Sequence, residues 1–136
     1  MKRLILSLLL ITAGACSSDT APLAISDTVI RKPLPGMHMS AGYFTLTNNT
    51  SDSIVITHVT SPQFGAVEKH ETIIEDGVAR MAALRDLELA PDSTTRFQPG
   101  GKHLMLMQPA ADLENVTLEF HSRDDMLLSI TVVATD

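Results

Sequence analysis

One strand-like run carries an imidazole and two thioethers on the same face. It follows the glycine pair Gly100-Gly101 and reads Lys-His-Leu-Met-Leu-Met over residues 102–107. Side chains of a β-strand alternate between its two faces, so His103, Met105 and Met107 share one face and two leucines share the other. Imidazole nitrogen and thioether sulfur are ligands of soft metal ions, whereas plain aliphatic side chains would pack equally well. The run therefore indicates part of a soft-metal site.

A second histidine–methionine pair lies on a predicted hairpin. Asp76-Gly77 separates two strand-like runs and is typical of a two-residue turn of type I′. With that turn, Thr72 lies opposite Met81. His70, two residues before Thr72, is then a diagonal neighbour of Met81 on the same face, with Cβ atoms about 6–8 Å apart. Two long side chains at that separation can bind one ion, whereas a three-residue loop would place them on opposite faces.

The two pairs together supply two imidazoles and two thioethers. This neutral, soft set favours Cu(I), and without a thiolate it has little hold on zinc. Each pair alone is weak evidence for a metal site, because a lone His-x-Met is more often part of ordinary sheet packing, in which methionine fills gaps, than a pair of metal ligands. Met107 lies one strand step beyond Met105, so core packing is the preferred interpretation for it. The cluster Met37-His38-Met39 is either a second, weak metal site or transfer contact or, by preference, an exposed loop with packed methionines.

The spacing of these residues resembles the motif of the periplasmic copper(I) chaperones of the PCuAC family. That motif is His, ten residues, Met, twenty-one residues and then His-x-Met, and this chain has the same intervals at His70, Met81, His103 and Met105. The surrounding segments resemble the family as well, over nearly all of residues 24–134. They comprise the early tyrosine strand that ends in Asn and the two segments that carry the histidines, at residues 42–48, 67–71 and 99–106.

This resemblance implies an all-β, cupredoxin-like Greek-key antiparallel β-sandwich without the blue-copper cysteine. It also implies that one Cu(I) is bound near the surface by His70, Met81, His103 and Met105. The ion would be delivered to a partner, commonly the binuclear copper centre of cytochrome c oxidase. A thiol-oxidoreductase-like copper protein is the second implied partner.

The elements that must position these residues are short strands. Runs rich in β-branched and apolar residues alternate with polar turns about every ten residues, which favours an antiparallel β-sandwich. No window sustains a helical repeat for three turns. The expected strands cover residues 25–31, 43–47, 54–59, 67–75, 78–84, 94–97, 103–107, 116–121 and 126–133.

The N-terminus has the pattern of an exported protein. Lys2-Arg3 precede a short apolar run, and Ala13-Gly14-Ala15 precede Cys16, the only cysteine. This indicates a signal peptide of lipoprotein type with lipidated Cys16, although the same small residues also suit ordinary signal peptidase. Ser17, rather than an acidic residue, follows Cys16, which resembles a signal for sorting to the outer membrane. We therefore predict a periplasmic protein that is anchored to the outer membrane by lipid. We predict a signal peptide at 1–15, a tether at 16–23 and the copper-binding domain at 24–136.

Composition narrows the function further. The formal net charge is −6, and without Lys2 and Arg3 it is 8 − 16 = −8. Such a surface repels phosphate backbones, which argues against nucleic-acid binding, but does not repel a cation. No nucleophile–base motif or phosphate loop is present, so we predict no enzyme. Copper storage or detoxification, an electron-transfer cupredoxin and a metal-free interaction module remain as alternatives to a chaperone.

Overall fold

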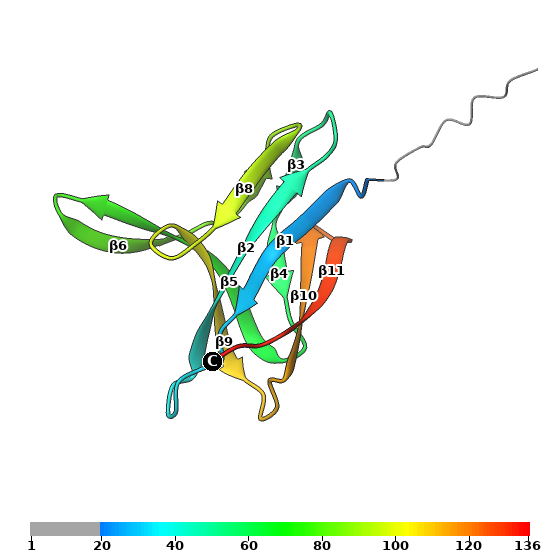
Figure 1. Ribbon diagram of the computed structural model, residues 1–136. Coiled ribbons are helices and arrows are strands. Elements are labelled where there is room, and N and C mark those ends of the chain that lie inside the picture. The colour runs from blue at the N-terminus through cyan, green and yellow to red at the C-terminus, as the bar shows by residue number, and fades with distance from the viewer. Residues whose placement is uncertain (1–19) are drawn as a thin grey trace, which may run out of the picture.

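The computed structural model describes residues 20–136, and it is built from β-strands (Figure 1). The predicted signal peptide and Cys16 lie outside the described residues. No helix in residues 20–136 is long and apolar enough to cross a membrane. The all-β prediction is confirmed. The strands are β1 (Leu23–Ile30), β2 (Met39–Asn48), β3 (Ile54–Ile56), β4 (His58–Thr60), β5 (Phe64–Glu75), β6 (Val78–Ala83), β7 (Leu87–Leu89), β8 (Ser93–Phe97), β9 (Lys102–Pro109), β10 (Asn115–Ser122) and β11 (Asp125–Val133).

The strands form a two-layer sandwich. One layer is a six-stranded sheet in the order β1-β2-β8-β9-β5-β6, in which β2 also pairs with β9. The other layer contains the three-stranded sheet β11-β10-β4, and β3 and β7 form a separate two-stranded ribbon. Aromatic rings pack between the layers: Phe44 stacks on Phe97 of its own sheet at 4.4 Å between ring centroids, and it meets Phe120 of the other layer edge-on at 5.4 Å. Such contacts favour one relative placement of the two sheets.

Alternation along β9 decides which face of the large sheet is buried. Leu104 and Leu106 are 0% exposed and belong to the core. Burying a leucine contributes about 2 kcal/mol, and a slip of one residue would turn both leucines out to solvent. His103 and Met105 must therefore point to the outer face of the sheet. Strand β2 follows the same rule, with Phe44 in the core and Tyr43 on the outer face.

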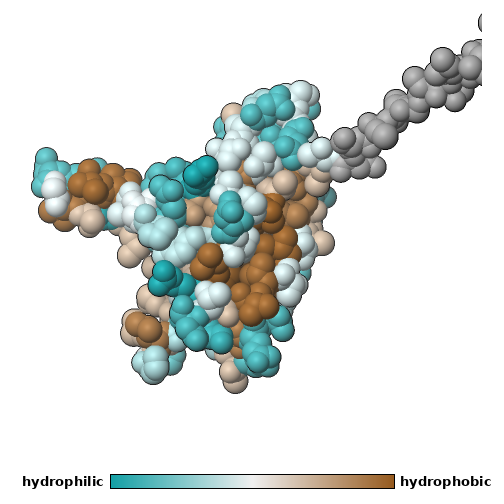
Figure 2. Space-filling view, viewed as in Figure 1, coloured by the Kyte–Doolittle hydropathy of each residue, from teal (hydrophilic) through white to brown (hydrophobic). Residues whose placement is uncertain are grey.

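The predicted hairpin is confirmed in its register. Glu75 pairs with Val78, and Thr72 pairs with Met81. Asp76 and Gly77 have φ values of 51° and 77°, as a type I′ turn requires. The hairpin of β5 and β6 extends beyond the rest of the sandwich (Figure 1), and apolar residues are exposed towards its end (Figure 2). Its exposed apolar side chains are Ile73, Ile74, Val78 and Met81.

The structure corrects three strand predictions. Residues 54–59 are two strands in different sheets, because Thr57 donates its backbone N–H to the His121 carbonyl (2.8 Å) and accepts from Lys69 Nζ at its own carbonyl (2.7 Å). A short strand over residues 87–89 was not predicted, and it pairs with β3. The first strand begins at Leu23, a buried residue that was placed in the tether.

Candidate metal site

Strands β5 and β9 bring two histidines together. His70 and His103 are directly opposite each other in the antiparallel register, and their ring centroids lie 6.0 Å apart. Their inward-pointing neighbours, Lys69 and Leu104, are also paired and are both buried. Both imidazoles therefore lie on the outer face of the sheet. Two imidazoles that bind one ion through bonds of about 2.0 Å have ring centres about 5–6 Å apart, so this pair is already close to that separation.

The two predicted methionine ligands flank this histidine pair. Met105 lies opposite Glu68, and Met81 lies opposite Thr72. Since Glu68 and Thr72 are each two residues from His70, both methionines are its diagonal neighbours, one on either side. The four predicted ligands thus share one face, with His70 at the centre. Met81 is 61% exposed on the projecting hairpin.

Hydrogen bonds fix the tautomer of each imidazole. His70 Nε2 lies 2.8 Å from Glu68 Oε2, and since a carboxylate accepts, the ring donates from Nε2. In the neutral ring Nδ1 is then the nitrogen without a proton, and it is buried without a hydrogen-bond partner. His103 Nδ1 lies 3.0 Å from the Gly101 carbonyl and donates to it, which leaves Nε2 as its free nitrogen. Each ring therefore offers one unprotonated nitrogen and is held at the other, as metal-binding histidines are.

A shallow hollow of about 390 Å³ contains most of this constellation. Met81, His103 and Met105 line it, whereas His70, which is paired with His103, does not. Tyr43 also lines the hollow, beside Met37, Met39, Leu34, Ser40, Ala41, Arg31, Lys32 and Asp136. The hollow gives Met81, His103 and Met105 access to solvent.

The cluster Met37-His38-Met39 lies where the chain enters β2, and only its methionines line the hollow. Met37 and His38 lie in an exposed loop as predicted, but Met39 begins β2, and neither methionine is packed away: Met37 is 52% and Met39 46% exposed. Met107 is not a core residue, so that prediction was wrong. It is half-buried on the outer face, between Met39 on β2 and Ala66 on β5.

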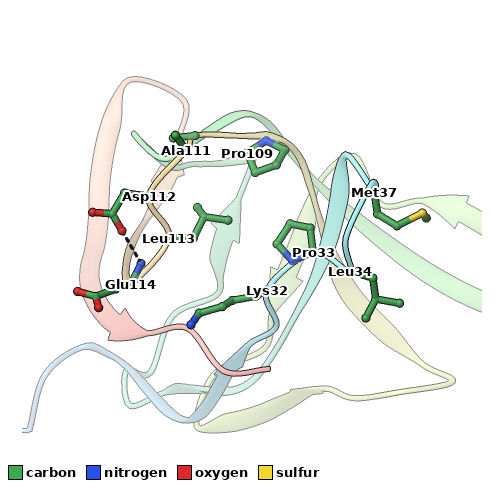
Figure 3. A pocket seen from close by; sticks show the side chains of 10 residues that line it. Lys32, Pro33, Leu34, Met37, Pro109, Ala111, Asp112, Leu113 and Glu114 are labelled. Atoms are coloured by element: carbon green, nitrogen blue, oxygen red, sulfur yellow. Dashed lines mark hydrogen bonds between the residues drawn. The ribbon is translucent and has the colours of Figure 1, made fainter.

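A second hollow, of about 400 Å³, lies beside the first and contains none of the four predicted ligands (Figure 3). Its lining includes Pro33 and Leu113, and Asp112 Oδ1 accepts from the Glu114 amide at 3.1 Å. In Figure 3 the sulfur of Met37 points away from this hollow. Met37 lines both hollows, whereas the four predicted ligands are absent from the lining of the second one.

The cations next to the histidines are directed away from them. Lys69, 6% exposed, points into the sandwich and donates to the Thr57 carbonyl. Burial lowers the pKa of Lys69 below 10.5, and the nearby carboxylate of Asp86 offsets part of that shift. Lys102 pairs with Glu71 at 2.7 Å. Neither neighbouring lysine on β5 or β9 therefore places its ammonium group beside the two imidazoles, and Lys32, which lines the hollow, is paired with Asp136 at 3.7 Å.

Sequence comparison identifies the family. A protein-family profile described as "LpqE-like: Putative lipoprotein LpqE-like" matches residues 23–133. The chain belongs to the LpqE-like family. Two curated relatives are the "Uncharacterized protein RP573" of Rickettsia prowazekii, 29% identical over 68% of this chain, and the "Putative lipoprotein Lxx21020" of Leifsonia xyli, 31% identical over 62%. The chain spans about half the length of these relatives, 55% of each.

Solved structures of PCuAC domains share the fold. The copper-bound PCuAC domain from PmoF2 superposes with a TM-score of 0.61 at 21% identity, over 83% of this chain and 90% of that domain. The solution structure of apo-DR1885 from Deinococcus radiodurans also gives 0.61, at 20% identity over 98% of this chain and 92% of that one. The LpqE-like chain is therefore an all-β, cupredoxin-like sandwich of the PCuAC type.

The sequence alone does not identify the two hydrogen-bond acceptors that orient the histidines. The Gly101 carbonyl orients His103 and carries no side-chain signal. Glu68 was visible as a charged residue two positions before His70, where alternation places it on the same face. From the sequence alone, a solvated strand face is the simpler explanation of that charge, and the 2.8 Å contact with His70 instead favours an orienting role.

Proposed function

We propose that this LpqE-like protein is a copper chaperone that binds one Cu(I) through His70, Met81, His103 and Met105. The observation that carries the proposal is the pairing of His70 and His103 at 6.0 Å with an unpartnered, buried nitrogen on His70. A buried polar atom without a partner costs about 1–3 kcal/mol, which a bound ion would recover. The fold, shared with a copper-bound PCuAC domain, supports the same conclusion.

The four proposed ligands favour Cu(I) and allow the bound ion to be released to a partner. Two thioethers and two neutral imidazoles are soft, uncharged donors that favour Cu(I) over hard divalent cations. Met81 lies on a projecting hairpin and is mostly exposed, so an incoming ligand can replace it first. A chaperone needs this stepwise exchange, and no catalytic turnover is assigned to the site. Its recipient in this proposal is the copper centre of cytochrome c oxidase, with a thiol-oxidoreductase-like copper protein in the same pathway.

Export and lipid anchoring belong to the same proposal. The family description as a lipoprotein supports lipidation of Cys16 after removal of residues 1–15, with the next few residues as the tether. Fractionation of cells that express wild type or Cys16→Ser tests the anchor. The wild type should co-fractionate with the outer membrane and Cys16→Ser with the soluble periplasm. The same distribution of both would refute lipid anchoring.

The ligands are tested by replacing Met81 and Met105 together with leucine and titrating Cu(I) under reducing conditions. We expect the double variant to lose tight one-to-one binding, because leucine keeps the volume but removes both sulfurs. X-ray absorption of the copper-loaded wild type should report two nitrogen and two sulfur ligands. Matched replacement of Met126, an exposed methionine on β11, should change neither result. Unchanged binding by the Met81/Met105 variant would refute the assignment.

Delivery is tested with a recipient. Cu(I)-loaded protein should transfer its ion to the soluble copper domain of an oxidase in a direct mixing experiment. Retention of the ion in the presence of excess apo-recipient would instead favour storage.

A further inference from the structure

Two thioethers outside the proposed ligand set lie in the same hollow. Met37 and Met39 line it together with Met81, His103 and Met105. They are 52% and 46% exposed, so neither gains the burial that usually accounts for a methionine in a folded domain. Their position requires another explanation.

The backbone holds both side chains towards the hollow. The Met37 amide donates to the Leu34 carbonyl at 2.8 Å, and Gly36 has φ 82°. Pro35-Gly36 in the central positions makes this a type II turn, a rigid connection that ends at Met37. Met39 then begins β2 and lies on the outer face opposite Met107, while Met37 lines the same hollow from the end of the turn and His38 does not line it. Met37 also borders the neighbouring hollow, but in Figure 3 its sulfur points away from that hollow.

Strand pairing brings Met39 next to a proposed ligand. Ala41 lies opposite Met105 and Met39 lies opposite Met107 in the pairing of β2 with β9. Met39 is therefore a diagonal neighbour of Met105, with Cβ atoms about 7 Å apart, within reach of two long side chains. The nearest acid in the lining, Asp136, is already paired with Lys32 at 3.7 Å. Beside Met105, the soft donors that Met37 and Met39 add to the lining are thioether sulfurs.

We propose that Met37 and Met39 form a second Cu(I) position beside the first, with Met105 as a ligand common to both. This proposal rests on the Cu(I) site proposed above. An ion that arrives from a donor or leaves for a recipient binds the two exposed sulfurs first or last. It then moves between positions by exchanging thioethers one at a time, with no change of oxidation state. Because the donors are neutral sulfurs, the second position selects Cu(I) over Cu(II) and Zn²⁺.

The test separates the rate of transfer from affinity. In the Met37→Leu/Met39→Leu variant, the stoichiometry and equilibrium affinity of the first site should equal those of wild type. The rate of Cu(I) transfer to a competing bidentate chelator should fall on the order of tenfold, the lower end of the effect of removing groups around a metal site. Since affinity is a ratio of rates, uptake should slow by the same factor. Met126→Leu removes an equally exposed methionine from β11 and should transfer at the wild-type rate.

Two results would overturn the proposal in different ways. Wild-type transfer rates in the double variant would refute the second position while leaving the first site intact. Failure of the wild type to bind Cu(I) would refute the proposed function, and the second position with it.

A direct readout uses the six methionines of residues 24–136 as probes. With [methyl-13C]methionine labelling, Ag(I) serves as a redox-inert analogue of Cu(I). The first equivalent should shift the methyl signals of Met81 and Met105. Further Ag(I) should shift Met37 and Met39 and leave Met126 unchanged. Methyl signals of Met37 and Met39 that stay fixed, or move only together with Met126, would overturn the proposal.

Discussion

Glu68 should determine how tightly the proposed site holds Cu(I), although it is not itself a ligand. Its carboxylate accepts from His70 Nε2 at 2.8 Å, which keeps Nδ1 unprotonated and aimed at a fixed position. It also raises the electron density on the ring and hence the strength of the bond to the metal. Replacing Glu68 with alanine releases the ring and lets either nitrogen carry the proton. The affinity for Cu(I) should therefore fall.

The size of the effect follows from the exposure of Glu68. A hydrogen bond to a charged group contributes about 1.5–3 kcal/mol when it is buried. The Glu68 side chain is 54% exposed, so water screens the interaction and the lower end applies. A loss of about 1.4 kcal/mol corresponds to an affinity about tenfold weaker. Glu68→Gln keeps an acceptor oxygen but not the charge, so its loss should be roughly half as large in free energy, about threefold in affinity.

The assay is competition for Cu(I) against a chromophoric chelator at constant ionic strength. Glu71→Ala is the matched control, because it removes one carboxylate from the same strand on the opposite face, where Glu71 pairs with Lys102. It should change the affinity less than twofold, since exposed charges are screened by salt. Equal losses in Glu68→Ala and Glu71→Ala would show that net charge matters and the hydrogen bond does not. Wild-type affinity in Glu68→Ala would refute the tautomer argument itself.

Three further predictions concern stability. Asn48→Ala should lower the free energy of unfolding, measured in urea, by about 3 kcal/mol, because this fully buried amide donates to three main-chain carbonyls. The control Asn49→Ala removes one exposed hydrogen bond and should lower it by less than about 1 kcal/mol. Gly77→Ala should destabilise the hairpin by about 1 kcal/mol, because φ is 77°, and should lower the thermal midpoint; an unchanged midpoint would contradict the turn. The pKa of Lys69 is lower in the folded state than in the unfolded chain. At pH values between the lowered pKa and 10.5 the unfolded chain therefore binds more protons, so the free energy of unfolding should rise with pH. Lys69→Met should lack this rise in urea unfolding measured at increasing pH, and the same slope in both proteins would contradict it.

Local patterns were enough to predict much of the sheet. Asp76-Gly77 predicts the turn, and the turn fixes the register that makes His70 and Met81 diagonal neighbours. Alternation in β9 places His103 and Met105 opposite two leucines. These inferences hold because turn geometry and the two-residue period depend only on neighbouring residues. The division of residues 54–59 could not be found in this way, because it depends on the bonds of Thr57 to His121 and Lys69, which are distant in sequence.

The sequence by itself determined the two halves of the candidate site, one on the β5–β6 hairpin and one on β9, and their spacing related them to a known motif. Only the tertiary structure decided how the halves meet, because the pairing of β5 with β9 closes a loop of more than thirty residues and no local rule sets its register. That pairing puts His70 opposite His103 and Glu68 beside His70. Likewise, the sequence supplied Met37 and Met39 as a cluster, but the pairing of β2 with β9 placed them in the hollow of the proposed ligands.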